Sequence, residues 1–187
     1  MANVDQPYGL RAVRTLSGGC VSTNEYKIAS GYAANIFSGD PVKLVAAGTI
    51  EIAAGGTTNS IGVFSGCSYV DASGNQIFKK YWPSGTTATE IKALVYDNPE
   101  IIFAVQSDAT GVAAADVGAH ADWQIVAGDT RVGISNTNLD ASAAIGATKA
   151  GLRVLRIIDI DDNAAGAYSD IEVQMSEHAF NTVGAGI

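Results

Sequence analysis

The sequence predicts an all-β protein built as an antiparallel β-sandwich or a small barrel, with little helix. Short apolar runs separated by turn-forming residues occur along most of the chain, and no helical segment of 10–15 residues lies between them. The 21 glycines and the many alanines also favour frequent turns over long helices. At 187 residues the chain is long enough to bury a core without a metal ion or a disulfide framework.

The N-terminal 25 residues differ in pattern from the rest of the chain. Turn-formers such as Asp5-Gln-Pro7 and Ser17-Gly-Gly19 recur every few positions, with isolated apolar residues between them. Fully extended, such a segment would span on the order of 80 Å. We therefore expect an extended arm over residues 1–25 and a single β domain over residues 26–187. A segment that lies along its own domain is the alternative.

From residue 26 onward, short apolar runs alternate with Gly, Asn, Asp, Ser and Pro. Alternation with a period of two, typical of half-buried strands, is clearest in Leu152–Ile157 and Ile171–Met175. The turn signals Asp71–Asn75 and Asp97–Pro99 separate neighbouring runs. The expected strands are Tyr26–Ala29, Pro41–Val45, Thr49–Ala53, Ile61–Tyr69, Ile77–Tyr81, Ile91–Tyr96, Ile101–Gln106, Trp123–Ala127, Arg131–Ser135, Leu152–Ile158 and Ile171–Ser176.

Helix candidates are few and short. The alanine-rich stretch 113–119 could form one or two turns, and 141–147 is a weaker candidate. The region 129–150 is rich in Gly, Asn, Ser and Thr, which predicts long connections.

Composition narrows the classes of partner. Nineteen acidic and 11 basic side chains give a net charge of −8, which argues against nucleic acid and against an anionic membrane surface. No apolar run reaches the roughly 18 residues that a membrane-spanning helix requires. Only 16% of the residues are charged, below the roughly 25% of ordinary soluble domains, and 47% are hydrophobic. Association with copies of itself is therefore plausible.

No set of residues points to catalysis, so we expect a non-enzyme that uses no cofactor. His120 and His178 lie far apart and lack the paired Cys or His spacing of a zinc site. The Gly-x-Ser-x-Gly element of serine hydrolases does not occur, and Ala54–Thr58 lacks the lysine of a phosphate-binding loop. Cys20 and Cys67 are too few for a disulfide framework, and two free thiols are the favoured interpretation.

One acidic loop partly matches a calcium-binding pattern. Asp159, Asp161 and Asn163 correspond to positions one, three and five of an EF-hand loop, and Asp170 corresponds to position twelve. Position six is Ala164, where the sharp turn requires glycine, and the flanking segments are predicted strands rather than helices. An acidic connection between two strands accounts for the same residues, so we expect no metal site.

Two lysines precede an aromatic pair at 79–82. Lys79, Lys80, Tyr81 and Trp82 form a mixture that also occurs in sites for single-stranded nucleic acid. Here the group stands alone in an acidic chain, and tyrosine and tryptophan are enriched in protein interfaces. We therefore predict that Tyr81 and Trp82 contribute to an interface.

Several blocks share a pattern with a known family. The first block is Ala2–Arg14, with Asp5-Gln-Pro7-Tyr-Gly9-Leu-Arg11 at its centre. The others are Tyr26–Ile28, Gly39–Leu44, Ile61–Phe64, Asp97–Gln106, Leu152–Ile157 and the strand closing on Glu177-His178. Together these blocks, spread over most of the chain, resemble capsid decoration (cement) proteins of tailed bacteriophages.

This resemblance implies a jelly-roll or β-tulip domain on the exterior of the virion capsid, where it would clamp neighbouring capsomers. The implied partners are the lattice of the major capsid protein and further copies of the chain, as a homotrimer or alternatively a dimer. In the arm, Arg11 and Arg14 would pair with acidic groups of the lattice. Tyr8, Leu10 and Val13 would act as apolar anchors.

A second hypothesis belongs to a different class of function. The chain could be a carbohydrate- or host-surface-binding β module of a phage fibre or tail. This hypothesis requires an exposed aromatic platform, which Tyr81 and Trp82 would provide.

Overall fold

The computed structural model describes residues 3–142, 145–146, 148 and 150–181. Within these ranges, every pairing between strands is antiparallel and the sheets pack as a sandwich without closing into a barrel, so the predicted all-β class is confirmed. The helical content of the same ranges is one 3-10 turn, Ala114–Asp116. No helix in the described part of the chain is long and apolar enough to cross a membrane. The jelly-roll or β-tulip topology stays a prediction.

The first sheet, sheet A, takes strands from both halves of the chain. In the described residues it has six strands in the order β1 (Arg11–Thr15), β10 (Ile101–Gln106), β14 (Asp170–Met175), β13 (Leu152–Ile157), β11 (His120–Gln124) and β12 (Asn138–Asp140). All six residues of β10 are buried, as a continuous apolar run predicts for a strand covered on both faces. The alternating pattern of β13 instead leaves Arg153 and Arg156 exposed.

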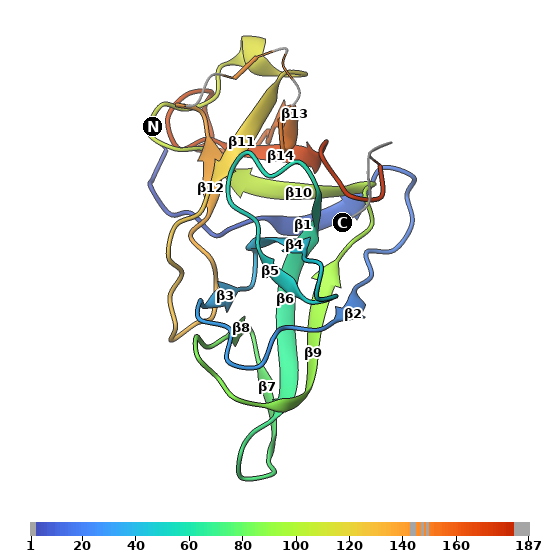
Figure 1. Cartoon of the computed structure of the whole chain (residues 1–187). Helices are drawn as coiled ribbons and strands as arrows, with labels where there is room; N and C mark the ends of the chain where they lie inside the picture. Colours follow the sequence, from blue (N-terminus) through green and yellow to red (C-terminus); the bar gives the residue numbers. More distant parts are fainter. Residues whose placement is uncertain (1–2, 143–144, 147, 149, 182–187) are drawn as a thin grey trace.

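The second sheet, sheet B, comes from a continuous stretch of the chain. Its order is β2 (Asn24–Tyr26), β9 (Thr89–Tyr96), β6 (Ser60–Val70), β4 (Pro41–Leu44) and β5 (Ile50–Ile52), with β7 (Gln76–Lys79) paired to β6. A small sheet joins β3 (Ile36–Phe37) to β8 (Tyr81–Trp82). The long hairpin of β6 and β7 extends away from the body of the molecule (Figure 1). At its turn, the Asp71 carboxylate accepts hydrogen bonds from the backbone N–H groups of Ser73 and Asn75.

Strands β1, β10 and β14 of sheet A run across β6 and β9 of sheet B in Figure 1, and most buried apolar residues of each sheet form a separate core cluster. Trp123 of β11 lies in the sheet A core and donates an indole hydrogen bond to the carbonyl oxygen of Ala53, 2.7 Å away, just after β5. Elsewhere, β6 passes β9 at Gly62, where φ is 147° and an added Cβ would overlap the carbonyl oxygen of Tyr96. A side chain at this position would separate the two central strands of sheet B.

The N-terminal segment is less separate than the sequence suggested. Residues 11–15 of the expected arm form β1, which pairs with β10, and Leu10 is buried in the sheet A core. Asn24–Tyr26 pair with β9 as β2. These parts of the segment therefore belong to the sandwich, because they bury apolar surface and complete sheet hydrogen bonds.

Two other local predictions need correction. Arg131–Ser135 is not a strand, because the Asp129 side chain accepts from the Arg131 N–H at 2.8 Å and Gly133 has φ of 79°, so the chain turns there. The helix candidate 113–119 reduces to the 3-10 turn Ala114–Asp116. The other candidate, 141–147, includes residues 143, 144 and 147, which lie outside the described ranges.

Candidate binding surface

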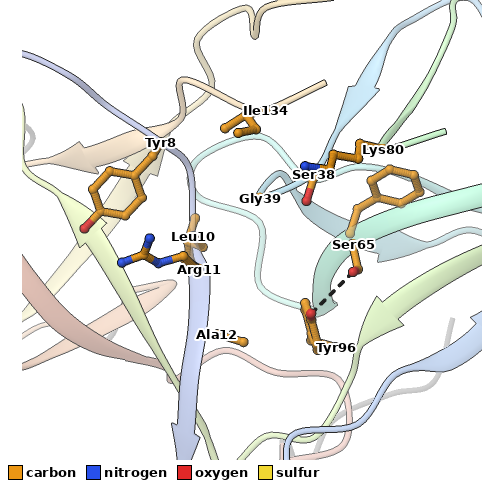
Figure 2. A pocket seen from close by; sticks show the side chains of 11 residues that line it. Tyr8, Leu10, Arg11, Ala12, Ser38, Gly39, Ser65, Lys80, Tyr96 and Ile134 are labelled. Carbon is orange, nitrogen blue, oxygen red and sulfur yellow. Dashed lines mark hydrogen bonds between the residues drawn. The ribbon is translucent and has the colours of Figure 1, made fainter. Parts of the chain in front are cut away.

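A groove of about 320 Å³ lies where the N-terminal segment passes sheet B. In Figure 2, Tyr8 and Arg11 stand on one side of this groove, and Ser38 and Lys80 stand on the other. Its lining contains two cationic side chains and no Asp or Glu, so we call it the basic groove. The lining residues are Tyr8, Leu10, Arg11, Ala12, Ser38, Gly39, Phe64, Ser65, Lys80, Tyr96 and Ile134.

Backbone contacts fix the floor of the basic groove. The Leu10 N–H donates to the Gly39 carbonyl at 2.9 Å, and the Gly39 N–H donates to the Phe64 carbonyl at 2.8 Å. This crossing requires glycine at two positions, because Gly9 and Gly39 have φ of 73° and 101° and a Cβ on Gly9 would lie 2.8 Å from the Cβ of Ser135. Gly39, in the turn before β4, thus links the N-terminal segment to β6 by backbone hydrogen bonds on both sides.

A buried carboxyl group holds the opposite wall. Asp40 accepts hydrogen bonds from the Ser135 hydroxyl at 2.5 Å, the Thr137 hydroxyl at 3.0 Å and the Phe37 N–H at 2.7 Å. Burial raises the pKa of Asp40 above its usual value, and these hydrogen bonds oppose that shift. The network ties the long connection around Ile134 to the turn between β3 and β4, and so gives the groove a fixed shape.

The cations of the groove have no acidic partner in the described residues. Neither Arg11 nor Lys80 lies in a salt bridge there. The Arg11 guanidinium instead lies over the Tyr8 ring, 5.2 Å from its centroid. The Tyr8 hydroxyl donates to Asp170 at 3.0 Å, and both burial and this carboxylate raise the pKa of Tyr8. With two cationic side chains and no Asp or Glu in its lining, the groove is suited to hold an anionic group.

A second, acidic depression of about 280 Å³ adjoins the basic groove. Its lining includes Val4, Tyr8, Asp170 and residues 160–162 of the exposed segment 159–162, which we call the acidic loop. Asn163, which matches a calcium-loop position, uses its amide to close this loop: it donates to the carbonyls of Ile158 and Asp170 and accepts from the Asp170 N–H. Within the described ranges, no group of three or more His, Cys, Asp or Glu could hold a metal ion.

The predicted arm residues have different environments. Val13 is 47% exposed on β1, and Tyr8 and Arg11 line the basic groove. Leu10 was expected as an apolar anchor for the lattice, but it is 2% exposed and lies in the sheet A core. Arg14 forms a salt bridge within the chain, since its Nη2 lies 2.8 Å from Glu172 Oε2. Sequence reasoning missed Glu172, whose local pattern is that of an ordinary strand residue.

The two residues of the predicted aromatic pair, Tyr81 and Trp82, also have different environments. Trp82 has 0% exposure and packs edge-to-face against Tyr69, so it cannot serve as a surface contact in this structure. Tyr81 is half-buried and stacks on Phe37 at 5.4 Å. An exposed aromatic residue, Phe78 of β7, lies nearby. Side chains alternate between the two faces of a strand, so the sequence Gln76–Lys79 indicates that Phe78 faces away from Ile77.

Comparison of the chain with protein-family models, with curated proteins and with solved structures gives no match. Function is therefore inferred from the all-β fold, the chemistry of this surface and the sequence blocks described above.

Proposed function

We propose that the chain is a non-enzymatic structural protein of a phage virion that binds the outer surface of the assembled capsid and clamps neighbouring capsomers. The resemblance of its sequence blocks to capsid decoration proteins motivates this proposal. The antiparallel sandwich and the low content of charged residues support it, because both suit a protein that uses its surface for contacts with other proteins.

The observation that carries the proposal is the apolar exposure of β1. This strand ends the described order of sheet A, and it carries Val13 at 47% exposure, followed by Leu16 at 61%. An unpaired sheet edge that carries exposed apolar side chains can accept a contact with another protein. Because Arg14 anchors the same strand to Glu172, β1 presents these side chains on a rigid support.

On a capsid, such a surface would act repeatedly. Each copy would contribute a modest apolar contact, and the symmetric arrangement of copies on the shell would multiply its effect through avidity. In this proposal the partners are the lattice of the major capsid protein and other copies of the chain, as a homotrimer or dimer. The protein would occupy the exterior of the virion.

The test is binding to capsid shells of the encoding phage prepared without this protein. The variant Val13→Asp/Leu16→Asp is expected to co-sediment with shells at least about tenfold more weakly, because two apolar contacts become charged. Val117→Asp is the control for placing an aspartate at an exposed apolar position, since Val117 is 46% exposed and lies outside β1. If the double variant binds as well as the control, or if the unmodified chain ignores the shells, the proposal is wrong.

The carbohydrate-binding alternative lacks the exposed aromatic platform on which it depends. It requires an aromatic platform at Tyr81 and Trp82, and Trp82 is buried in the core of sheet B. An array of glycans still provides a direct check, because binding that a Tyr81→Ala substitution abolishes would revive this alternative.

A further inference from the structure

The basic groove and the acidic depression are neighbours that share one lining side chain. Tyr8 lines both depressions: its ring lies under the Arg11 guanidinium, and its hydroxyl donates to Asp170 on the acidic side. The surface therefore changes from basic at Lys80 and Arg11 to acidic at residues 159–162, with Tyr8 at the boundary.

Both halves of this surface carry charged side chains that form no salt bridge in the described residues. In the described part of the chain, Arg11 and Lys80 form no salt bridge, and neither do Asp161 and Asp162, which are exposed. In a protein of net charge −8, a groove lined by two cations and no acid is a local reversal of the overall sign. Such a surface attracts an acidic segment.

Apolar side chains accompany the charges on the acidic side. Ile160, at the centre of the acidic loop, is 56% exposed, and Val4 beside it is 67% exposed. The basic groove offers apolar surface in return, from Tyr96 and Ile134. The loop sequence Asp159-Ile-Asp-Asp162 thus combines the two features that would fill the basic groove: carboxylates for the cations and one aliphatic side chain for the wall.

We propose that two copies of the chain associate about a twofold axis near Tyr8, with the acidic loop of each copy seated in the basic groove of the other. A twofold contact requires a self-complementary surface, which adjacent regions of opposite charge provide, because each copy supplies both halves. The Arg11 guanidinium would receive a carboxylate of the second copy in a charge-assisted hydrogen bond. The inference rests on the proposed function and specifies the contact between copies.

The experiment is sedimentation velocity of the purified chain over a range of concentrations. The unmodified chain is expected to form a dimer whose stability falls as salt rises, because exposed charge pairs are screened. Arg11→Glu and Asp161→Lys should each weaken association about tenfold or more, because the twofold axis places each reversed charge at two contacts of the dimer. Lys80→Glu is a second groove variant in case Arg11→Glu disturbs folding. Lys27→Glu, exposed and outside both regions, is the control for net charge.

Mixing the Arg11→Glu and Asp161→Lys chains is the decisive step. In a mixed dimer, the introduced glutamate of one chain meets the introduced lysine of the other at one contact, and the original pair meets at the second contact. Equal amounts of the two chains should therefore associate as tightly as the unmodified chain.

Several outcomes would overturn the inference. A monomer at about 100 µM, a trimer mass, or a mixture that stays dissociated would each do so. So would an Arg11→Glu chain that dimerises normally but loses binding to shells, because the groove would then hold a lattice segment. A monomeric chain that still binds shells would overturn this inference and leave the proposed function standing.

Discussion

Replacing Glu172 by glutamine is expected to loosen β1 from the sandwich. The Glu172 side chain is 4% exposed and accepts a hydrogen bond from Arg14 at 2.8 Å and two from Arg156 at 3.0 and 2.7 Å. Glutamine keeps the size of the side chain but removes the charge and replaces one acceptor oxygen with a donor. Hydrogen bonds to charged groups contribute about 1.5–3 kcal/mol each when both partners are buried. The arginine side chains are 46% and 56% exposed, so we expect a total loss of about 1–2 kcal/mol in the free energy of unfolding.

The assay is urea denaturation of both proteins across a range of pH. The two arginines hold the pKa of Glu172 below its usual value of 4.5, with the Arg156 hydrogen bonds as the largest cause. Stabilisation by a carboxylate with a lowered pKa is fully present above the unfolded pKa and is lost as pH falls through the folded pKa. The difference between wild type and Glu172→Gln should therefore be full at pH 7 and should shrink below pH 4.5.

The exposed ion pair of Glu25 with Lys92 supplies the control. Glu25→Gln should leave the unfolding free energy nearly unchanged, because both side chains of this pair are more than half exposed. An unfolding free energy that does not change in Glu172→Gln, or a loss that stays constant between pH 7 and pH 3, would refute the assignment of the stabilisation to charge.

Two further predictions concern particular backbone and thiol environments. Gly62→Ala should prevent folding, since its Cβ would overlap the Tyr96 carbonyl oxygen. Gly74 has φ of 82° with open space around it, so Gly74→Ala should fold with a loss of about 1 kcal/mol in the free energy of unfolding. Circular dichroism and thermal melts distinguish the two outcomes. Cys67 should resist a thiol reagent at pH 8 while Cys20 reacts, because burial raises the pKa of Cys67 to about 12 and Cys20 is exposed. Two reactive thiols in the native protein would contradict this prediction.

Strands that carry a strong local pattern could be predicted from the sequence. The run Ile101–Gln106 is β10, and the alternation in Leu152–Ile157 corresponds to β13. Apolar periodicity is a property of neighbouring residues, so it can be read without knowing the partner strand. The two- and three-residue strands are different: Ile36–Phe37 forms a strand because Trp82 lies opposite Ile36, and no local pattern reveals that partner.

The candidate surface was predictable only in part. The sequence indicates contact residues in the N-terminal segment, and Val13 and Arg11 are exposed there. It does not reveal that Arg14 pairs with Glu172, since the two residues are 158 positions apart. The basic groove likewise combines residues from separate segments of the chain, among them Lys80 and Ile134, so no residue spacing in the sequence predicts this groove. Such sites depend on sheet topology, which local residue preferences do not specify.

The order of strands in sheet A has a consequence for synthesis on the ribosome. Sheet B uses only residues 24–96 and can pair as soon as that stretch has emerged. In contrast, β10 pairs with β1 from the start of the chain and with β14 near residue 175. The nascent chain must therefore carry β1 unpaired until β10 is translated, and the centre of sheet A stays open until β14 arrives. We expect this late closure, which joins distant segments, to be the slow phase of refolding.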